Sequence, residues 1–220
     1  TYGARACDYL GWKDLCAYAA WSGLRPMTEL EFEKAARGPL AAVSGEKPWG
    51  TTGITNCAAA GISGTEDGTE YCTTASANCT YNNINFTSGS GGYGPTRVGI
   101  YATSTTATAR ASAGAGFYGN LDLSGNVSER VVTVGNSTGR AFLGSHGDGV
   151  LSSAVNATNP DWPGYSNGEV LGSTGSGSRG GTWLALAASG EMTTSSRTSA
   201  ANPVTSRSYT SGGRCVRTAP

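Results

Sequence analysis

Aliphatic residues are scarce in this chain, and this scarcity limits the folds that it can adopt. Leu, Ile, Val and Phe make up 31 of the 220 residues, whereas well-packed globular proteins usually exceed roughly one fifth. Disorder is nevertheless not expected, because 15 basic residues balance 15 acidic ones, and five Trp and ten Tyr supply large apolar side chains. Gly, Ser and Thr account for 86 residues. We therefore expect a single ordered, loop-rich domain over residues 1–220.

Charge and composition also exclude several classes of function. The formal net charge is zero and Lys occurs three times, which argues against general nucleic-acid binding, since that needs a basic surface. No apolar run reaches the roughly 18 residues that cross a bilayer, so membrane insertion is not expected. The single histidine, His146, excludes sites that need two, and its Gly-rich turn beside Asp148 favours a solvated turn over a metal ligand.

The cysteines do not form a recognisable metal motif. No Cys-x-x-Cys pair occurs, which argues against a zinc ribbon. The even number permits disulfides, and Cys57, Cys72 and Cys79 lie in one Gly/Thr/Asn-rich stretch that a disulfide would stabilise. Buried free thiols are the alternative, and the redox compartment stays open. The six cysteines are Cys7, Cys16, Cys57, Cys72, Cys79 and Cys215.

Two helices are predicted near the start of the chain. A helix over residues 11–21 follows from apolar side chains that recur with helical spacing. A second helix over residues 28–37 follows from the capping box of Thr28 and Glu31, and Gly38 ends it. The apolar positions of the first helix are Trp12, Leu15, Cys16, Ala19 and Ala20.

The rest of the chain is predicted to hold short strands and long loops. Residues 39–120 are mostly Gly, Thr, Ser, Asn and Ala, which indicates long ordered loops with a few short strands, for example at 97–101. Together with the helices, this predicts an α+β fold. Further strands are predicted at 131–134, 140–143, 181–186 and 213–217.

An oxygen-rich turn lies between Asp122 and Glu129. The two carboxylates are seven residues apart and flank a Gly-Asn turn whose carbonyls can point inward. Such an arrangement suits a hard cation such as Ca²⁺. The alternative is that both carboxylates cap the turn and pair with an arginine such as Arg130.

Six motifs, taken in order, resemble the formylglycine-generating-enzyme type of C-type-lectin fold. The resemblance covers nearly the whole chain and implies an α+β lectin-like fold with two helices, short strands and long ordered loops. The family also has N-terminal strands, which have no counterpart in this sequence, so the resemblance implies a missing upstream segment of the same protein as a partner. The motifs are residues 12–21, GLRPMTELEFEKAARG at 23–38, PWG at 48–50, YGNLDLSGNVSE at 118–129, RGGTW at 179–183 and GRCVR at 213–217.

The catalytic branches of this family match less well. The oxidase branch implies a redox cysteine pair with copper, at positions that here fall on about Ala185 and Gly190. The related sulfoxide synthases bind iron through several histidines, which the single His146 cannot supply. We therefore expect a protein that is not an enzyme. The alternative is a formylglycine-generating-type oxidase or related enzyme with relocated chemistry, for which Cys215 is the candidate.

The sequence is more similar to a third branch, the variable proteins of diversity-generating retroelements. In these proteins adenine-directed mutagenesis rewrites a C-terminal lectin-type surface, and the altered codons yield mainly residues such as Ala, Ser, Thr, Val, Leu and Tyr. Residues 184–210 fit that alphabet, and the implied variable region is 180–217. The candidate ligand-binding residues are Trp183, Leu184, Ala185, Leu186, Ala187, Ala188, Val204, Ser206, Ser208, Tyr209 and Thr210.

This resemblance implies a receptor-type, ligand-binding function. The partner would be an unidentified protein or surface ligand, and the protein would lie at a cell surface, in a secreted form or on a phage particle. An ordinary buried strand is the alternative for residues 184–188, and a purely structural domain is the alternative for the whole chain. The oxidases have a similar cation motif, which implies a structural Ca²⁺ with ligands Asp122, Gly125, Val127 and Glu129, Gly125 and Val127 giving carbonyls.

Overall fold

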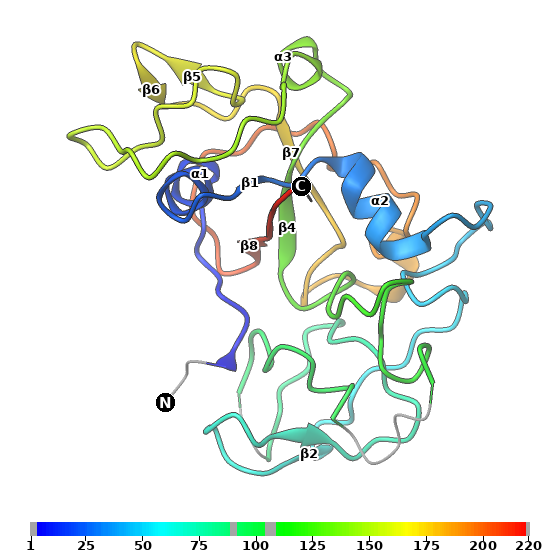
Figure 1. The fold of residues 1–220 in the computed structure, drawn as a ribbon. Helices are drawn as coiled ribbons and strands as arrows, with labels where there is room; N and C mark the ends of the chain where they lie inside the picture. The colour runs from blue at the N-terminus through cyan, green and yellow to red at the C-terminus, as the bar shows by residue number, and fades with distance from the viewer. Residues whose placement is uncertain (1–3, 89–91, 104–108, 219–220) are drawn as a thin grey trace.

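The computed structural model describes residues 4–88, 92–103 and 109–218, and its fold is α+β, as predicted (Figure 1). The helices are α1 (Trp12–Trp21), α2 (Glu29–Arg37) and the short α3 (Ser137–Arg140), with a 3-10 turn η2 (Ala187–Ser189). The strands are β1 (Arg25–Pro26), β2 (Ile62–Ser63), β3 (Tyr71–Cys72), β4 (Ser128–Val132), β5 (Tyr165–Ser166), β6 (Glu169–Val170), β7 (Ser176–Arg179), β8 (Ser211–Gly213) and β9 (Cys215–Val216).

The centre of the molecule is a sheet with the order β7-β4-β8. β4 pairs antiparallel with β7, with Glu129 opposite Arg179, and parallel with β8, with Ser128 opposite Ser211. All five residues of β4 are buried. In Figure 1 the helices α1 and α2 lie on either side of this sheet. The sheet therefore lies between the two N-terminal helices and includes β8 from the C-terminal end of the chain.

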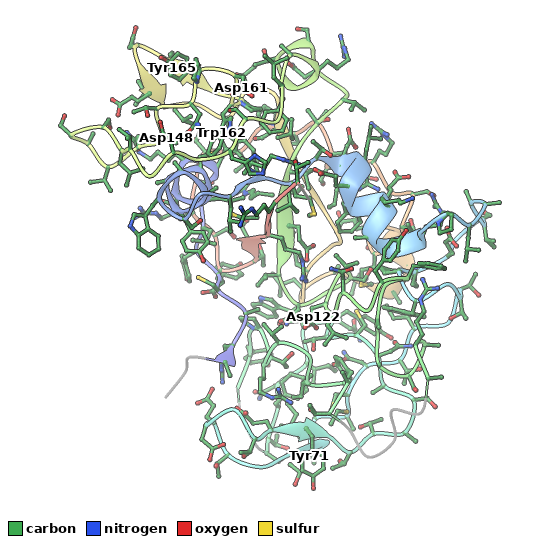
Figure 2. The ribbon with its side chains drawn as sticks, in the orientation of Figure 1. Tyr71, Asp122, Asp148, Asp161, Trp162 and Tyr165 are labelled. Carbon is green, nitrogen blue, oxygen red and sulfur yellow. The ribbon has the colours of Figure 1, made fainter. Side chains whose placement is uncertain are left out.

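Both predicted N-terminal helices are confirmed. The apolar face of α1 is buried, and its Trp12 donates from Nε1 to the carbonyl of Pro163 at 2.7 Å. Trp162 packs in the same cluster, next to α1 in Figure 2. In α2 the capping box forms as expected, because Thr28 Oγ1 accepts from the Glu31 amide and the Glu31 carboxylate accepts from the Thr28 amide. Both ends of α2 are thus set by local chemistry.

Within 39–120, the described residues 39–88, 92–103 and 109–120 are mainly irregular, as expected, and fold around their own small core. That core includes Cys57, Ile62, Cys72 and Ile100. β2 and β3 pair within it, whereas the predicted strand at 97–101 is a turn preceded by a single bridge. The six cysteines are free thiols, and the Sγ atoms of Cys57 and Cys72 lie 2.8 Å apart. Glycine- and threonine-rich loops can therefore be ordered by a compact satellite cluster.

Two predicted strands are wrong. Residue 140 ends α3 and residues 141–143 follow it, because the side chain of Asn136 caps that helix by accepting from the Thr138 amide at 2.8 Å. Residues 181–186 are irregular, with a turn at 183–184, because Gly180 and Gly181 adopt φ of 89° and 71° and end β7. At Gly180 a Cβ would lie 2.5 Å from Glu129 Oε2, so a side chain has no room there.

Two other strands are displaced or divided. β4 begins three residues earlier than the predicted 131–134, and it ends before Thr133, because Thr133 and Val134 donate hydrogen bonds to the carboxylate of Glu29. The predicted strand at 213–217 is split into β8 and β9 at Arg214. A side-chain partner far away in the sequence therefore sets the end of β4.

Candidate functional site

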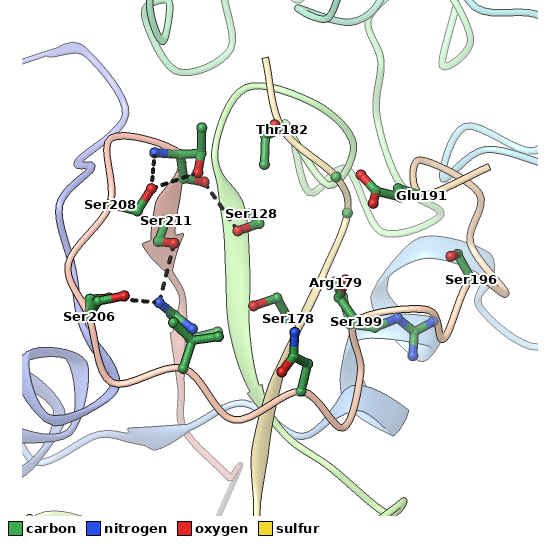
Figure 3. A pocket seen from close by; sticks show the side chains of 16 residues that line it. Ser128, Ser178, Arg179, Thr182, Glu191, Ser196, Ser199, Ser206, Ser208 and Ser211 are labelled. Atoms are coloured by element: carbon green, nitrogen blue, oxygen red, sulfur yellow. Dashed lines mark hydrogen bonds between the residues drawn. The ribbon is translucent and has the colours of Figure 1, made fainter. Parts of the chain in front are cut away.

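A pocket of about 360 Å³ opens beside β4, β7 and the segment 191–211 (Figure 3). Most of its lining residues carry hydroxyl groups. These are Ser128, Ser178, Thr182, Ser196, Ser199, Ser206, Ser208, Thr210 and Ser211, and the others are Arg130, Arg179, Gly180, Gly181, Glu191, Asn202, Val204. We call this the hydroxyl pocket. Its volume suits a small ligand or one residue of a larger partner.

The C-terminal segment 204–210 supplies alternate side chains to the hydroxyl pocket. The even-numbered residues of this segment line it. The odd-numbered Arg207 instead makes a two-bonded ion pair with Asp14 of α1, with distances of 2.7 and 2.8 Å. The backbone is held separately, because the Ser208 carbonyl accepts from Tyr9 and the Thr210 carbonyl accepts from Ser128, both at 2.9 Å. Backbone bonds therefore set most of the path of this segment, and Ser208 Oγ adds one bond to it by accepting from the Thr210 amide at 3.3 Å.

Tyr209 points to a second hollow, of about 690 Å³, which we call the aromatic groove. The rings of Trp183 and Tyr209 lie 5.8 Å apart, and Trp183 donates from Nε1 to the Tyr209 carbonyl at 3.1 Å. The Tyr9 ring also lies near Tyr209, tilted by 59°, with ring centroids 6.3 Å apart. The groove is lined by Arg5, Ala6, Cys7, Asp8, Tyr9, Tyr93, Gly94, Pro95, Trp183 and Tyr209. The segment 204–210 thus contributes to both hollows.

A buried ionic network supports the wall formed by β7. Glu29 of α2 is fully buried and accepts from Arg179 at 3.1 Å and from Arg197 at 2.7 Å. Arg179 also donates to Glu33 at 3.0 Å and to the Thr194 carbonyl at 2.6 Å. These bonds tie α2, β7 and the segment after η2 together. The charge of Arg179, although it lines the hydroxyl pocket, is therefore neutralised.

Arg130 differs from Arg179 in having no acidic partner within the described residues. Its side chain is 1% exposed, and Nη2 donates to the Ser206 carbonyl at 3.2 Å and to Ser211 Oγ at 3.3 Å. Its Nε has no hydrogen-bond partner there. Burial lowers the pKa of this guanidinium. Sequence patterning missed this residue, although Ser128 and Arg130 alternate along one strand.

The predicted cation turn forms a separate pocket of about 120 Å³. Asp122, Val127 and Glu129 line this pocket, whereas Gly125 does not. Asp122 Oδ2 accepts from the Gly99 amide at 2.6 Å. Figure 2 shows Asp122 where the central sheet meets the loops of residues 39–120. The structure therefore brings three of the four predicted ligands together.

Glu129 shares that pocket with Asp122 and Arg214. Its Oε1 accepts from Arg214 Nε at 2.9 Å, and its Oε2 has no partner in the described part of the chain. Burial raises the pKa of Glu129 to about 7 and also raises that of Asp122. The arginine that pairs here is Arg214, not Arg130. The unpartnered oxygen fits a cation ligand, but Arg214 competes for the same carboxylate, and no cluster of three acidic, Cys or His side chains occurs among the described residues.

The other predicted contact residues lie apart from both hollows. Leu184 is half-buried, and Ala185 is buried against Trp49, Cys79 and Met192. Residues 186–188 are exposed at the turn η2. Of the predicted binding set, Trp183 and the segment 204–210 are thus the members that line a hollow.

The surroundings of Cys215 bear on the enzymatic alternative. This thiol is half-buried at β9, and burial raises its pKa to about 11. A thiol in that state is a poor nucleophile and a poor metal ligand at neutral pH. His146 Nε2 accepts from the Thr218 amide at 3.0 Å.

No known family model matches the sequence, and no curated protein is significantly similar to it. No helix within the described ranges is both long and apolar enough to cross a membrane.

Proposed function

We propose that this protein is a ligand-binding, receptor-type variable protein of a diversity-generating retroelement. It would have a C-type-lectin-like fold of the formylglycine-generating-enzyme type. The ligand would be held by the hydroxyl pocket and the aromatic groove, and the segment 204–210 would provide the side chains that change between copies. The proposal places the protein at a cell surface, in a secreted form or on a phage particle.

The alternation along residues 204–210 is the observation that carries this proposal. A surface that accepts many side chains needs a backbone that is held by other means. Here the carbonyls of Ser208 and Thr210 bind backbone amides of Tyr9 and Ser128, while the even-numbered side chains face the hydroxyl pocket. Substitution of those side chains would change the ligand contact and leave these bonds in place.

Residues that are expected to stay constant between copies support the same division. Met192 is fully buried, and Trp183 is 8% exposed. Arg197 pairs with the buried Glu29. These residues hold the walls of the site, which explains why they would stay constant while their neighbours vary.

The aromatic groove supplies the strongest contacts available on this surface. Tyr9, Tyr93 and Tyr209 are each about half exposed, and tyrosine and tryptophan dominate the binding energy of many protein interfaces. A partner with an apolar side chain would fit the groove, and its polar groups would meet the adjacent hydroxyl pocket. This arrangement suits recognition of a protein or of a surface ligand.

The proposal is tested by the DNA next to the gene. We expect a near-copy of the segment that encodes residues 180–217, with adenines at the codons of Ser206, Ser208 and Tyr209, beside a reverse-transcriptase gene. The codons of Met192 and Trp183 provide the internal control, because they should be identical in the two copies. Absence of such a repeat from the surrounding DNA would contradict the retroelement assignment.

A further inference from the structure

The hydroxyl pocket contains a buried positive charge that nothing in the described residues neutralises. Arg130 is 1% exposed and lies outside ion-pair distance of every described carboxylate. Arg179, the other arginine of this pocket, is paired with Glu29 and Glu33. Arginine side chains that are removed from water are normally paired with an acid. The missing acid points to a ligand that supplies it.

The guanidinium of Arg130 is held in place but is not saturated. Nη2 is fixed by the Ser206 carbonyl and by Ser211 Oγ, while Nε has no partner among the residues described. A guanidinium offers parallel N–H donors that match the two oxygens of a carboxylate. Figure 3 shows Ser206 and Ser211, the residues that hold Arg130, on one side of β4, and Glu191 on the other.

Glu191 limits the kind of anion that the hydroxyl pocket can take. It lines the same pocket and makes no ion pair with a described residue. Its carboxylate would repel a doubly charged phosphate or sulfate more than a singly charged group. It would accept a hydrogen bond from a hydroxyl or amide group of the same ligand. The surrounding serine and threonine hydroxyls can either donate or accept.

We propose that the hydroxyl pocket binds the carboxylate of its ligand at Arg130, with the polar remainder of the ligand directed toward Glu191. The site therefore takes a monoanionic, hydroxyl- or amide-bearing group. This inference rests on the proposed ligand-binding role of the pocket and not on the retroelement assignment. Two sources share this chemistry, an acidic sugar and an acidic amino-acid side chain.

Calorimetric titration at constant ionic strength tests the site and distinguishes the sources. The probes are glucuronate with its neutral counterpart glucose, and N-acetyl-aspartate amide with its neutral counterpart N-acetyl-asparagine amide. We expect one of the two carboxylates to bind and its neutral counterpart to bind at least about tenfold more weakly. Equal binding of a carboxylate and its neutral counterpart, or no binding of either carboxylate, overturns the proposal.

Arg130→Met tests the residue, and Arg140→Met is its matched control. Arg140 is exposed, donates to the Val134 carbonyl and does not line the hydroxyl pocket. We expect Arg130→Met to weaken carboxylate binding by at least about tenfold and Arg140→Met to leave it unchanged. Equal binding by both variants overturns the proposal.

A measurement on the unaltered protein keeps the proposal testable if Arg130→Met does not fold. The side-chain Nε–H signal of Arg130 should shift in an NMR titration with the carboxylate that binds, and should not move with its neutral counterpart. A signal that stays fixed while the carboxylate binds overturns the proposal. Carboxylate binding without a genomic repeat would contradict only the retroelement assignment, whereas a repeat without carboxylate binding would contradict only the Arg130 site.

Discussion

At the scale of single residues, β4 places a buried cation, Arg130, and a buried acid, Glu129, in two different pockets. Ser128 and Arg130 face the hydroxyl pocket, whereas Glu129 lines the small pocket of the predicted cation turn. Successive side chains of a strand point to opposite faces, so three consecutive residues serve two different sites. Burial raises the pKa of Glu129 and lowers the pKa of Arg130, because both side chains are removed from water.

The raised pKa of Glu129 predicts that stability falls as the pH rises. Its pKa is about 7 in the folded chain because of burial, compared with an ordinary value of 4.5. Below pH 4.5 the carboxyl is protonated in both states, and between these two pKa values unfolding releases a proton, so rising pH favours the unfolded chain. The loss amounts to about 3 kcal/mol and is complete above the folded pKa. Arg214 and Asp122 are the charged groups that act on it most directly.

Urea unfolding of the native protein and of Glu129→Gln checks this prediction. The native protein should lose stability between about pH 5 and about pH 8 relative to the variant, because glutamine does not titrate. Parallel pH profiles for the two proteins would show that Glu129 titrates normally in the folded chain.

At the scale of elements, the ionic network around Glu29 connects α2, β7 and the segment after η2. Arg179→Met should lower the free energy of unfolding by about 3–5 kcal/mol, since it leaves part of a buried charge without its partner. Arg207→Met is the matched control, because Arg207 is mostly exposed and also pairs with an acid, Asp14. Its loss should be much smaller in the same denaturation experiment, because water screens an exposed ion pair. Equal losses for the two variants would contradict the structural role of the network.

Elements that depend on local chemistry could be predicted from the sequence. Thr28 and Glu31 lie three residues apart and cap α2 whatever surrounds them. The end of β4 could not be predicted, because it is set by hydrogen bonds from Thr133 and Val134 to Glu29, about a hundred residues away. The binding site divides in the same way. The sequence predicts residues 204–210 as a binding segment, whereas it does not predict that Arg130 lacks an acidic partner, because that depends on which side chains the fold brings to β4.

At the scale of the whole molecule, the cation turn lies where the loop layer of residues 39–120 meets the central sheet (Figures 1 and 2). A bound Ca²⁺ at Asp122 and Glu129 would therefore join two parts of the fold. Adding Ca²⁺ to chelator-treated protein should raise the melting temperature, by the equivalent of about 3 kcal/mol at a hundredfold excess over the dissociation constant.

Asp122→Asn should remove most of that increase, and Asp148→Asn should retain it, because Asp148 is exposed in a different region of the molecule. A native melting temperature that is the same with EDTA and with Ca²⁺ would contradict the predicted calcium site.

The central claim is that the ligand-binding side chains of residues 204–210 are separable from the fold. Chemical denaturation of the triple variant Val204→Ala, Ser206→Ala, Ser208→Ala, which changes side chains that line the hydroxyl pocket, tests it most directly, with Met192→Ala as the control for a fully buried residue. We predict that the triple variant loses about 1 kcal/mol or less, while Met192→Ala loses about 2–5 kcal/mol. A loss in the triple variant as large as that of Met192→Ala would show that these side chains hold the fold, and would contradict the account.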